Sequence, residues 1–83
     1  MTDKVLRVLA EICVYRHHIQ SLRKLILECE DEIADVQDMM QVCSARKRRE
    51  RSSECKEIQT FIASCRGRVG RYERWIKRLR REM

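Results

Sequence analysis

Hydrophobic residues recur every seven positions along the first half of this chain. One series is Val5, Ile12, Ile19, Ile26, Ile33 and Met40, and a second, three residues later, is Val8, Tyr15, Leu22, Cys29, Val36 and Cys43. Six consecutive pairs with this spacing are typical of the a and d positions of a coiled coil. The chain has no proline and only two glycines, so the composition also favours long helices.

A second heptad series follows in a different phase. Its a positions are Cys55, Ile62, Val69, Ile76 and Met83, and its d positions are Ile58, Cys65, Tyr72 and Leu79. The two series do not join, because the phase breaks within residues 44–54. We therefore predict one domain over residues 1–83, with a first helix at about 3–44, a basic connection at about 45–53 and a second helix at about 54–82. Thr2 or Asp3 can cap the first helix, and Ser52 or Ser53 the second.

An antiparallel pairing of the two segments fits both the apolar and the charged positions. It puts Cys43 opposite Cys55, Cys29 opposite Val69 and Tyr15 opposite Met83, and every layer between them is apolar. On the flanks, Glu30 meets Arg66 and Arg23 meets Glu73. A parallel dimer would instead stack the acidic residues of segment 28–38 against their own copies. The predicted fold is all-α, a long antiparallel two-helix coiled-coil hairpin that dimerises into a helical bundle.

In this register the first helix extends beyond the end of the second. The overhang carries apolar side chains that would lack a partner within the chain: Val5, Leu6, Val8, Leu9, Ile12 and Cys13. An exposed apolar surface of this kind indicates a binding partner. We expect a second copy of the chain or another helical protein there, and the alternative is a frayed helix end.

The net charge of +6 is unevenly distributed. Residues 1–43 carry 5 basic and 8 acidic side chains, whereas residues 56–83 carry 9 basic and 3 acidic ones. One basic group lies on the outer face of the second helix and comprises Arg71, Arg74, Lys77, Arg78 and Arg81. A second group lies at the predicted bend and comprises Arg46, Lys47, Arg48, Arg49 and Arg51. Such groups favour a polyanion, above all RNA or DNA. The alternatives are an acidic protein, an anionic membrane surface, or a solvated face that confers solubility.

Catalytic signatures are missing from the sequence. It contains no paired catalytic carboxylates, glycine-rich phosphate loop or nucleophile triad, so we expect no enzymatic activity, no cofactor and no small-molecule substrate. Cys13 and His17 share a helix side, but no second pair completes a metal site. No segment is apolar enough over ~18 residues to span a membrane.

The five cysteines bear on the cellular compartment. Because the count is odd, at least one cysteine lacks an intrachain partner, which favours the reducing cytoplasm or nucleus. The run from Cys55 to Cys65 has nine residues between its cysteines. It resembles one half of the twin C-x9-C helical hairpins of the mitochondrial intermembrane space, although Cys29 and Cys43 are separated by thirteen residues. That resemblance covers residues 29–65 and implies a disulfide between Cys43 and Cys55 and another between Cys29 and Cys65.

Two functional interpretations follow. The first is a self-associating hairpin that binds RNA or DNA, similar in architecture to small viral proteins that coat double-stranded RNA. The second is a structural coiled-coil subunit of a larger assembly, with a mitochondrial location in the twin-cysteine case.

Overall fold

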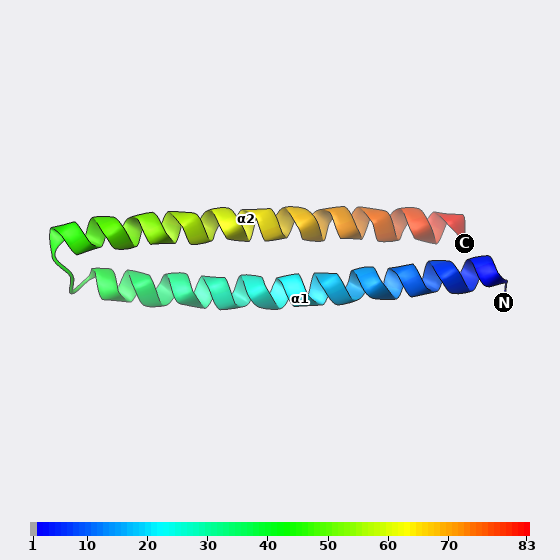
Figure 1. Cartoon of the computed structure of the whole chain (residues 1–83), viewed down its shortest axis with the longest axis horizontal. Helices are drawn as coiled ribbons and strands as arrows, with labels where there is room; N and C mark the ends of the chain where they lie inside the picture. The colour runs from blue at the N-terminus through cyan, green and yellow to red at the C-terminus, as the bar shows by residue number, and fades with distance from the viewer. Residues whose placement is uncertain (1) are drawn as a thin grey trace.

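The computed structural model describes residues 2–83 and consists of two antiparallel helices. Helix α1 spans Asp3–Met40 and helix α2 spans Ala45–Glu82, with 38 residues in each. The two helices lie side by side along almost their whole length in a rod of 64 × 14 × 11 Å (Figure 1). The predicted all-α helical hairpin is confirmed.

Each helix begins at a side chain that caps its first turn. The Thr2 hydroxyl accepts a hydrogen bond from the Val5 backbone N–H at 3.3 Å, as the sequence predicts. Ser44 has the same role in α2, where its hydroxyl accepts from the Lys47 N–H at 3.4 Å. These contacts satisfy backbone donors that a helix start leaves without an intrahelical partner.

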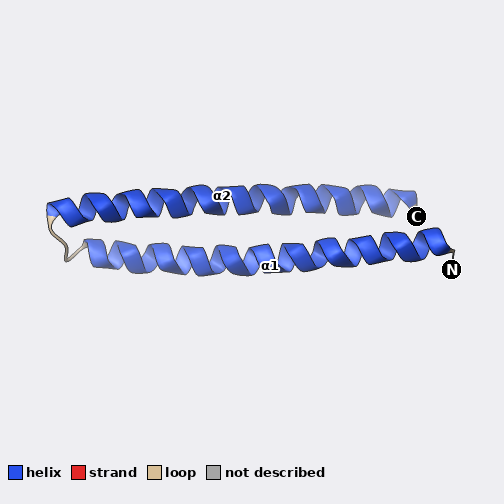
Figure 2. Cartoon of the chain, in the orientation of Figure 1, coloured by secondary structure: helices blue, strands red, loops and turns tan. Residues whose placement is uncertain are grey.

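The connection is shorter and earlier than the sequence predicts. It consists of residues 41–44, the only loop between the two helices within residues 2–83 (Figure 2). The predicted connection at 45–53 is instead the first part of α2, so the predicted caps Ser52 and Ser53 lie inside a helix. Arginine, lysine, glutamate and alanine are strong helix formers, and a high density of charge does not prevent them from forming one. The change of heptad phase is taken up by the turn.

The seam between the helices contains two apolar clusters. One comprises Val8, Ile12, Ile19, Val69 and Ile76, with Tyr15, Leu22, Tyr72 and Leu79 packed against it. The other comprises Ile26, Ile62 and Cys65, with Leu22, Leu25, Cys29, Ile33 and Ile58 around it. These are mostly the predicted a and d residues, so the sequence identifies the seam correctly.

The register of the pairing differs from the prediction by about one heptad. Val69 packs in the cluster of Ile12 and Ile19, whereas the predicted opposite residue, Cys29, packs near Ile62. Two helices of equal length joined by a four-residue turn must overlap almost completely, which fixes this register. A shift of seven residues still places every a position opposite a d position, so the apolar pattern alone does not distinguish the two registers.

The new register removes most of the predicted overhang. Val8 and Ile12 are only 5% and 3% exposed, because the last turns of α2 cover them. The prediction that the apolar side chains of the overhang lack an intrachain partner is therefore wrong for these two residues. Val5 is half-buried, whereas Leu6, Leu9 and Cys13 remain exposed on the outside of α1.

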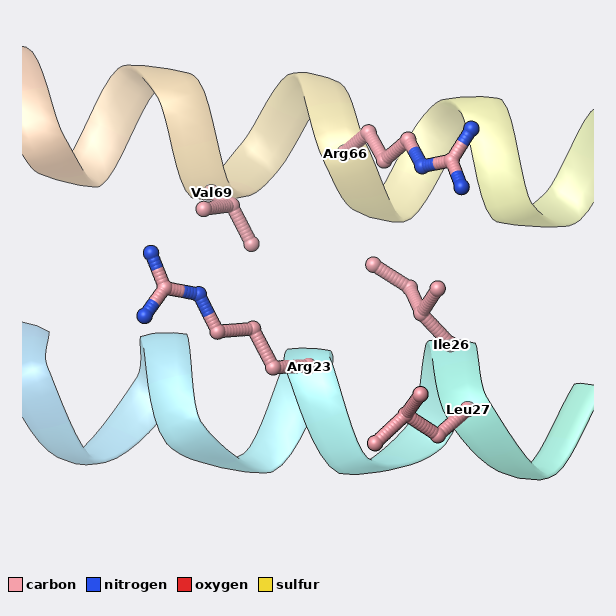
Figure 3. A pocket seen from close by; sticks show the side chains of 5 residues that line it. All are labelled: Arg23, Ile26, Leu27, Arg66 and Val69. Atoms are coloured by element: carbon pink, nitrogen blue, oxygen red, sulfur yellow. The ribbon is translucent and has the colours of Figure 1, made fainter.

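Two predicted ion pairs between the helices are confirmed. An Arg23 guanidinium nitrogen lies 3.1 Å from a Glu73 carboxylate oxygen, and Arg66 lies 2.8 Å from Glu30. The two arginines line a groove over the seam, and their guanidinium groups point in opposite directions along it (Figure 3). Each arginine thus reaches along the partner helix to its glutamate. Such exposed pairs contribute only about 0.2–1 kcal/mol each.

Candidate nucleic-acid interface

The outer face of α2 near its C-terminus carries a row of basic side chains, called here the open-end basic face. Its members are all exposed and are Arg71, Arg74, Lys77, Arg78 and Arg81. Residues separated by three, four or seven positions share one side of a helix, and the row extends about 15 Å along the axis. None of the ion pairs found in residues 2–83 involves any of the five. They therefore form a concentrated positive surface without acidic partners.

The basic group at the other end is placed differently from the prediction. Arg46, Lys47, Arg48, Arg49 and Arg51 lie on the first turns of α2, not on a loop. Three of them have partners within the hairpin. Arg46 lies 3.9 Å from Glu50, Arg51 lies 3.1 Å from Glu54, and the Arg48 Nε donates a 3.1 Å hydrogen bond to the Met40 carbonyl. These five basic residues are called here the tip basic group.

The contact of Arg48 with Met40 has a structural role that the sequence did not reveal. Met40 is the last residue of α1, and α1 has no basic residue in its last turn. The C-terminal end of a helix has unsatisfied carbonyl groups and a partial negative charge. Arg48, although eight residues further along the chain, supplies both a donor and a positive charge there. This arginine therefore fastens the end of α1 to the start of α2.

An aromatic cluster lies beside the open-end basic face. Tyr72 lies between its neighbours, with ring centroids 5.5 Å from Tyr15, 5.4 Å from His18 and 5.5 Å from Trp75. Tyr15 and Trp75 also lie 5.5 Å apart. This group was not predicted from the sequence, because the predicted register placed Tyr15 opposite Met83. With the correct register, the a and d pattern together with the flanking position of Trp75 would have brought the rings together.

The five cysteines are unbridged. Cys43 lies in the turn and its thiol donates to the Met39 carbonyl at 2.9 Å, whereas Cys55 is buried ten residues into α2. Ten residues span about 15 Å of helix, and a disulfide tolerates a Cα separation of only about 7 Å. The Cys43–Cys55 bridge implied by the twin-cysteine resemblance is therefore not compatible with this arrangement.

Cys29 and Cys65, by contrast, pack in the same apolar cluster. Burial raises the pKa of the Cys29 thiol, and the Glu32 carboxylate, Cys65 and Glu28 raise this pKa further. A raised pKa keeps the thiol protonated and lowers its nucleophilicity. Cys29 is thus a poor candidate for a reactive residue, and Cys13 is the exposed thiol of the chain.

The described residues also bear on metal binding and on membrane insertion. These residues contain no group of three or more His, Cys, Asp or Glu side chains that could hold a metal ion. Neither α1 nor α2 contains a stretch long and apolar enough to cross a membrane.

Comparisons with known proteins provide no family for this chain. No protein-family model matches it, and searches of curated proteins and of solved structures give no significant match. Its function must therefore be inferred from the surfaces of the hairpin.

Proposed function

We propose that this chain is a non-enzymatic, self-associating helical hairpin that binds RNA or DNA through the open-end basic face. The observation that carries the proposal is the row of five exposed basic side chains without an acidic partner. A solvated surface usually mixes both signs of charge, whereas six of the 13 acidic residues of this chain lie far from the row, between residues 28 and 38 of α1. Phosphate groups supply the missing negative charge, and binding releases counterions from the nucleic acid.

The tip basic group contributes a second contact in this proposal. Lys47 and Arg49 are exposed and take no part in the ion pairs found in residues 2–83. Two basic regions about one hairpin length apart allow one molecule to contact phosphates at separated points along a strand or duplex. The row on α2 remains the main site because all five of its members are free.

A mobility-shift assay with single-stranded and double-stranded RNA and DNA at two salt concentrations tests the proposal. We expect binding at low salt that weakens steeply as salt rises, because each phosphate contact releases counterions. Arg66→Ala is the internal control: it removes one positive charge, but Arg66 is held by Glu30 across the seam. It should leave affinity nearly unchanged. Absence of binding by the intact protein at low salt would refute the proposal.

Self-association is supported by apolar side chains that the hairpin leaves exposed. Leu6 and Leu27 on α1 are 53% and 62% exposed. A second copy covering such residues would form the helical bundle predicted from the sequence. Replacing Leu6 and Leu9 by lysine should lower the mass of the oligomer measured by light scattering. The hairpin should stay folded, since neither residue belongs to the seam clusters. An unchanged oligomer mass would exclude this surface as the association site.

The same exposed apolar residues also support a second candidate, a structural coiled-coil subunit of a larger protein assembly. In that case the basic row would meet an acidic protein, and nucleic acid would not bind. For the location, the wide separation of Cys43 and Cys55 does not fit the twin-cysteine hairpin, which supports a reducing compartment, cytoplasmic or nuclear, over the mitochondrial alternative. Mass spectrometry of the protein isolated under conditions that block thiol exchange tests this, because bridged cysteines would favour the mitochondrial interpretation.

A further inference from the structure

Trp75 is the most exposed large ring of the aromatic cluster. This residue is 41% exposed, whereas Tyr15 and Tyr72, whose rings contact it, are half-buried. The indole lies tilted at 51° to the Tyr15 ring and edge-on, at 80°, to the Tyr72 ring. The cluster therefore holds the tryptophan from the seam side and leaves part of it facing solvent.

Grooves lie on both sides of this indole, and each has arginine in its wall. One groove is lined by Arg68, Arg71, Tyr72 and Trp75. The other is lined by Tyr15, Trp75, Arg78 and Leu79. Two of these arginines, Arg71 and Arg78, belong to the open-end basic face, so the aromatic surface and the basic row form one continuous region.

The chemistry of this region suits a flat ligand with an attached negative charge. A nucleic acid base stacks on an aromatic ring, and a guanidinium group pairs with phosphate. Bases inside a duplex are stacked on their neighbours and do not offer a free face, whereas unpaired bases do. A second copy of the chain suits the region poorly, because a symmetric contact would bring the same arginine-rich surface of both copies together and like charges would repel.

We propose that Trp75 is a stacking site for an unpaired base of single-stranded RNA or DNA, with Arg68, Arg71 and Arg78 binding the adjoining phosphates. This inference rests on the proposed function and specifies it further: the preferred ligand is single-stranded. The open-end basic face then follows the backbone while the indole holds a base, a combination that binds without strong sequence preference.

Tryptophan fluorescence tests this directly, because Trp75 is the single tryptophan of the chain. The protein is titrated with a short oligouridylate, with an RNA duplex of the same length, and with inorganic polyphosphate. We expect saturable quenching by the oligouridylate. The duplex should quench far less, and polyphosphate should displace the oligouridylate and restore the fluorescence, because it has phosphates but no bases.

Two variants complete the test. Trp75→Ala removes the tryptophan signal, so its affinity is measured by mobility shift. This variant should bind oligouridylate about 5- to 150-fold more weakly, as expected for the loss of one stacked base. Phe61→Ala is the matched control: it removes another exposed aromatic ring of α2 that does not line either groove, and it should leave the affinity unchanged. Circular dichroism verifies that the variants fold. If Trp75→Ala disturbs the aromatic cluster, Trp75→Phe replaces it as the test variant: it retains a ring that can stack, and it should keep most of the affinity of the unchanged protein.

The outcomes separate this inference from the proposed function. Oligouridylate binding without quenching, and with equal affinity in Trp75→Ala, would refute the stacking site but leave the basic face intact. Fluorescence that changes with protein concentration and not with oligouridylate would place Trp75 between two copies of the chain, which also refutes it. No binding of any nucleic acid at low salt would refute both proposals.

Discussion

The two ends of this hairpin contain the same kind of residue in different roles. At the tip, three of the five basic residues have partners within the hairpin, and Arg48 fastens the end of α1. At the open end, five basic residues of α2 have no acidic partner and lie beside an aromatic cluster. A count of arginines therefore does not distinguish structural charge from charge that is available to a ligand. The two kinds of charge are distinguished only by whether an acidic or carbonyl group lies close to each basic side chain.

The largest expected effect concerns the packing at the open end. Ile12→Asp should lower the free energy of unfolding by several kcal/mol, because it places an unpaired charge in the cluster of Val8, Ile19 and Ile76. Leu6→Asp is the matched control on the exposed side of the same helix and should change stability by less than about 0.5 kcal/mol. Urea denaturation measures both. Equal effects would mean that the start of α1 is not packed against α2.

The next effect compares the two basic regions as ligand sites. Arg74→Ala combined with Arg78→Ala should weaken binding of single-stranded RNA roughly 10- to 100-fold and lower the salt slope by about 1.4, for two lost phosphate contacts. Lys47→Ala combined with Arg49→Ala removes the same charge from the tip and should cause a smaller loss. Mobility shifts at several salt concentrations give both slopes. Equal losses would show that net charge alone matters and that neither end is specialised.

A smaller effect tests the structural role of the tip. Arg48→Ala should lower the free energy of unfolding by about 1 kcal/mol, because the Met40 carbonyl loses its donor and the end of α1 loses a nearby positive charge. Arg49→Ala, at the adjacent exposed position, should have almost no effect on stability. Thermal unfolding by circular dichroism distinguishes the two. If both variants behave alike, the hydrogen bond to Met40 contributes nothing measurable.

Much of the fold could be predicted from the sequence because each helix carries its own repeating signal. The a and d series identified the seam, and the opposite charges of Arg23 with Glu73 and of Glu30 with Arg66 identified contacts that the structure contains. The register could not be fixed in the same way, since heptads repeat and a shift by seven residues keeps every layer apolar. The length of the turn decides the register, and the turn was placed too late because residues 45–53 were interpreted as a loop.

The candidate site was only partly visible in the sequence. Helical periodicity correctly grouped Arg71, Arg74, Lys77, Arg78 and Arg81 on one exposed face. It could not show that Arg48 is used within the hairpin, because that contact depends on where the turn lies. The aromatic cluster was missed for the same reason: Tyr15 and Tyr72 are far apart in the sequence, and only the correct register brings them together.

The smallest expected effect concerns the two glycines that precede the open-end basic face. A Cβ added at Gly67 would meet nothing within 4 Å, and one at Gly70 would meet only the end of the Arg74 side chain, at 3.8 Å. The hairpin itself therefore does not require either glycine, and alanine favours a helix by about 0.5–1 kcal/mol. Gly67→Ala and Gly70→Ala should each raise the free energy of unfolding by up to that amount in urea denaturation.

If a phosphate backbone approaches α2 closely at these positions, the same variants should bind RNA more weakly although they are more stable, because the added methyl group keeps the strand away. Ala63→Gly, at an exposed position one turn earlier on α2, is the control for the opposite change and should lower stability without altering RNA affinity. Unchanged RNA affinity in both glycine variants would confine the contact surface to the arginine side chains.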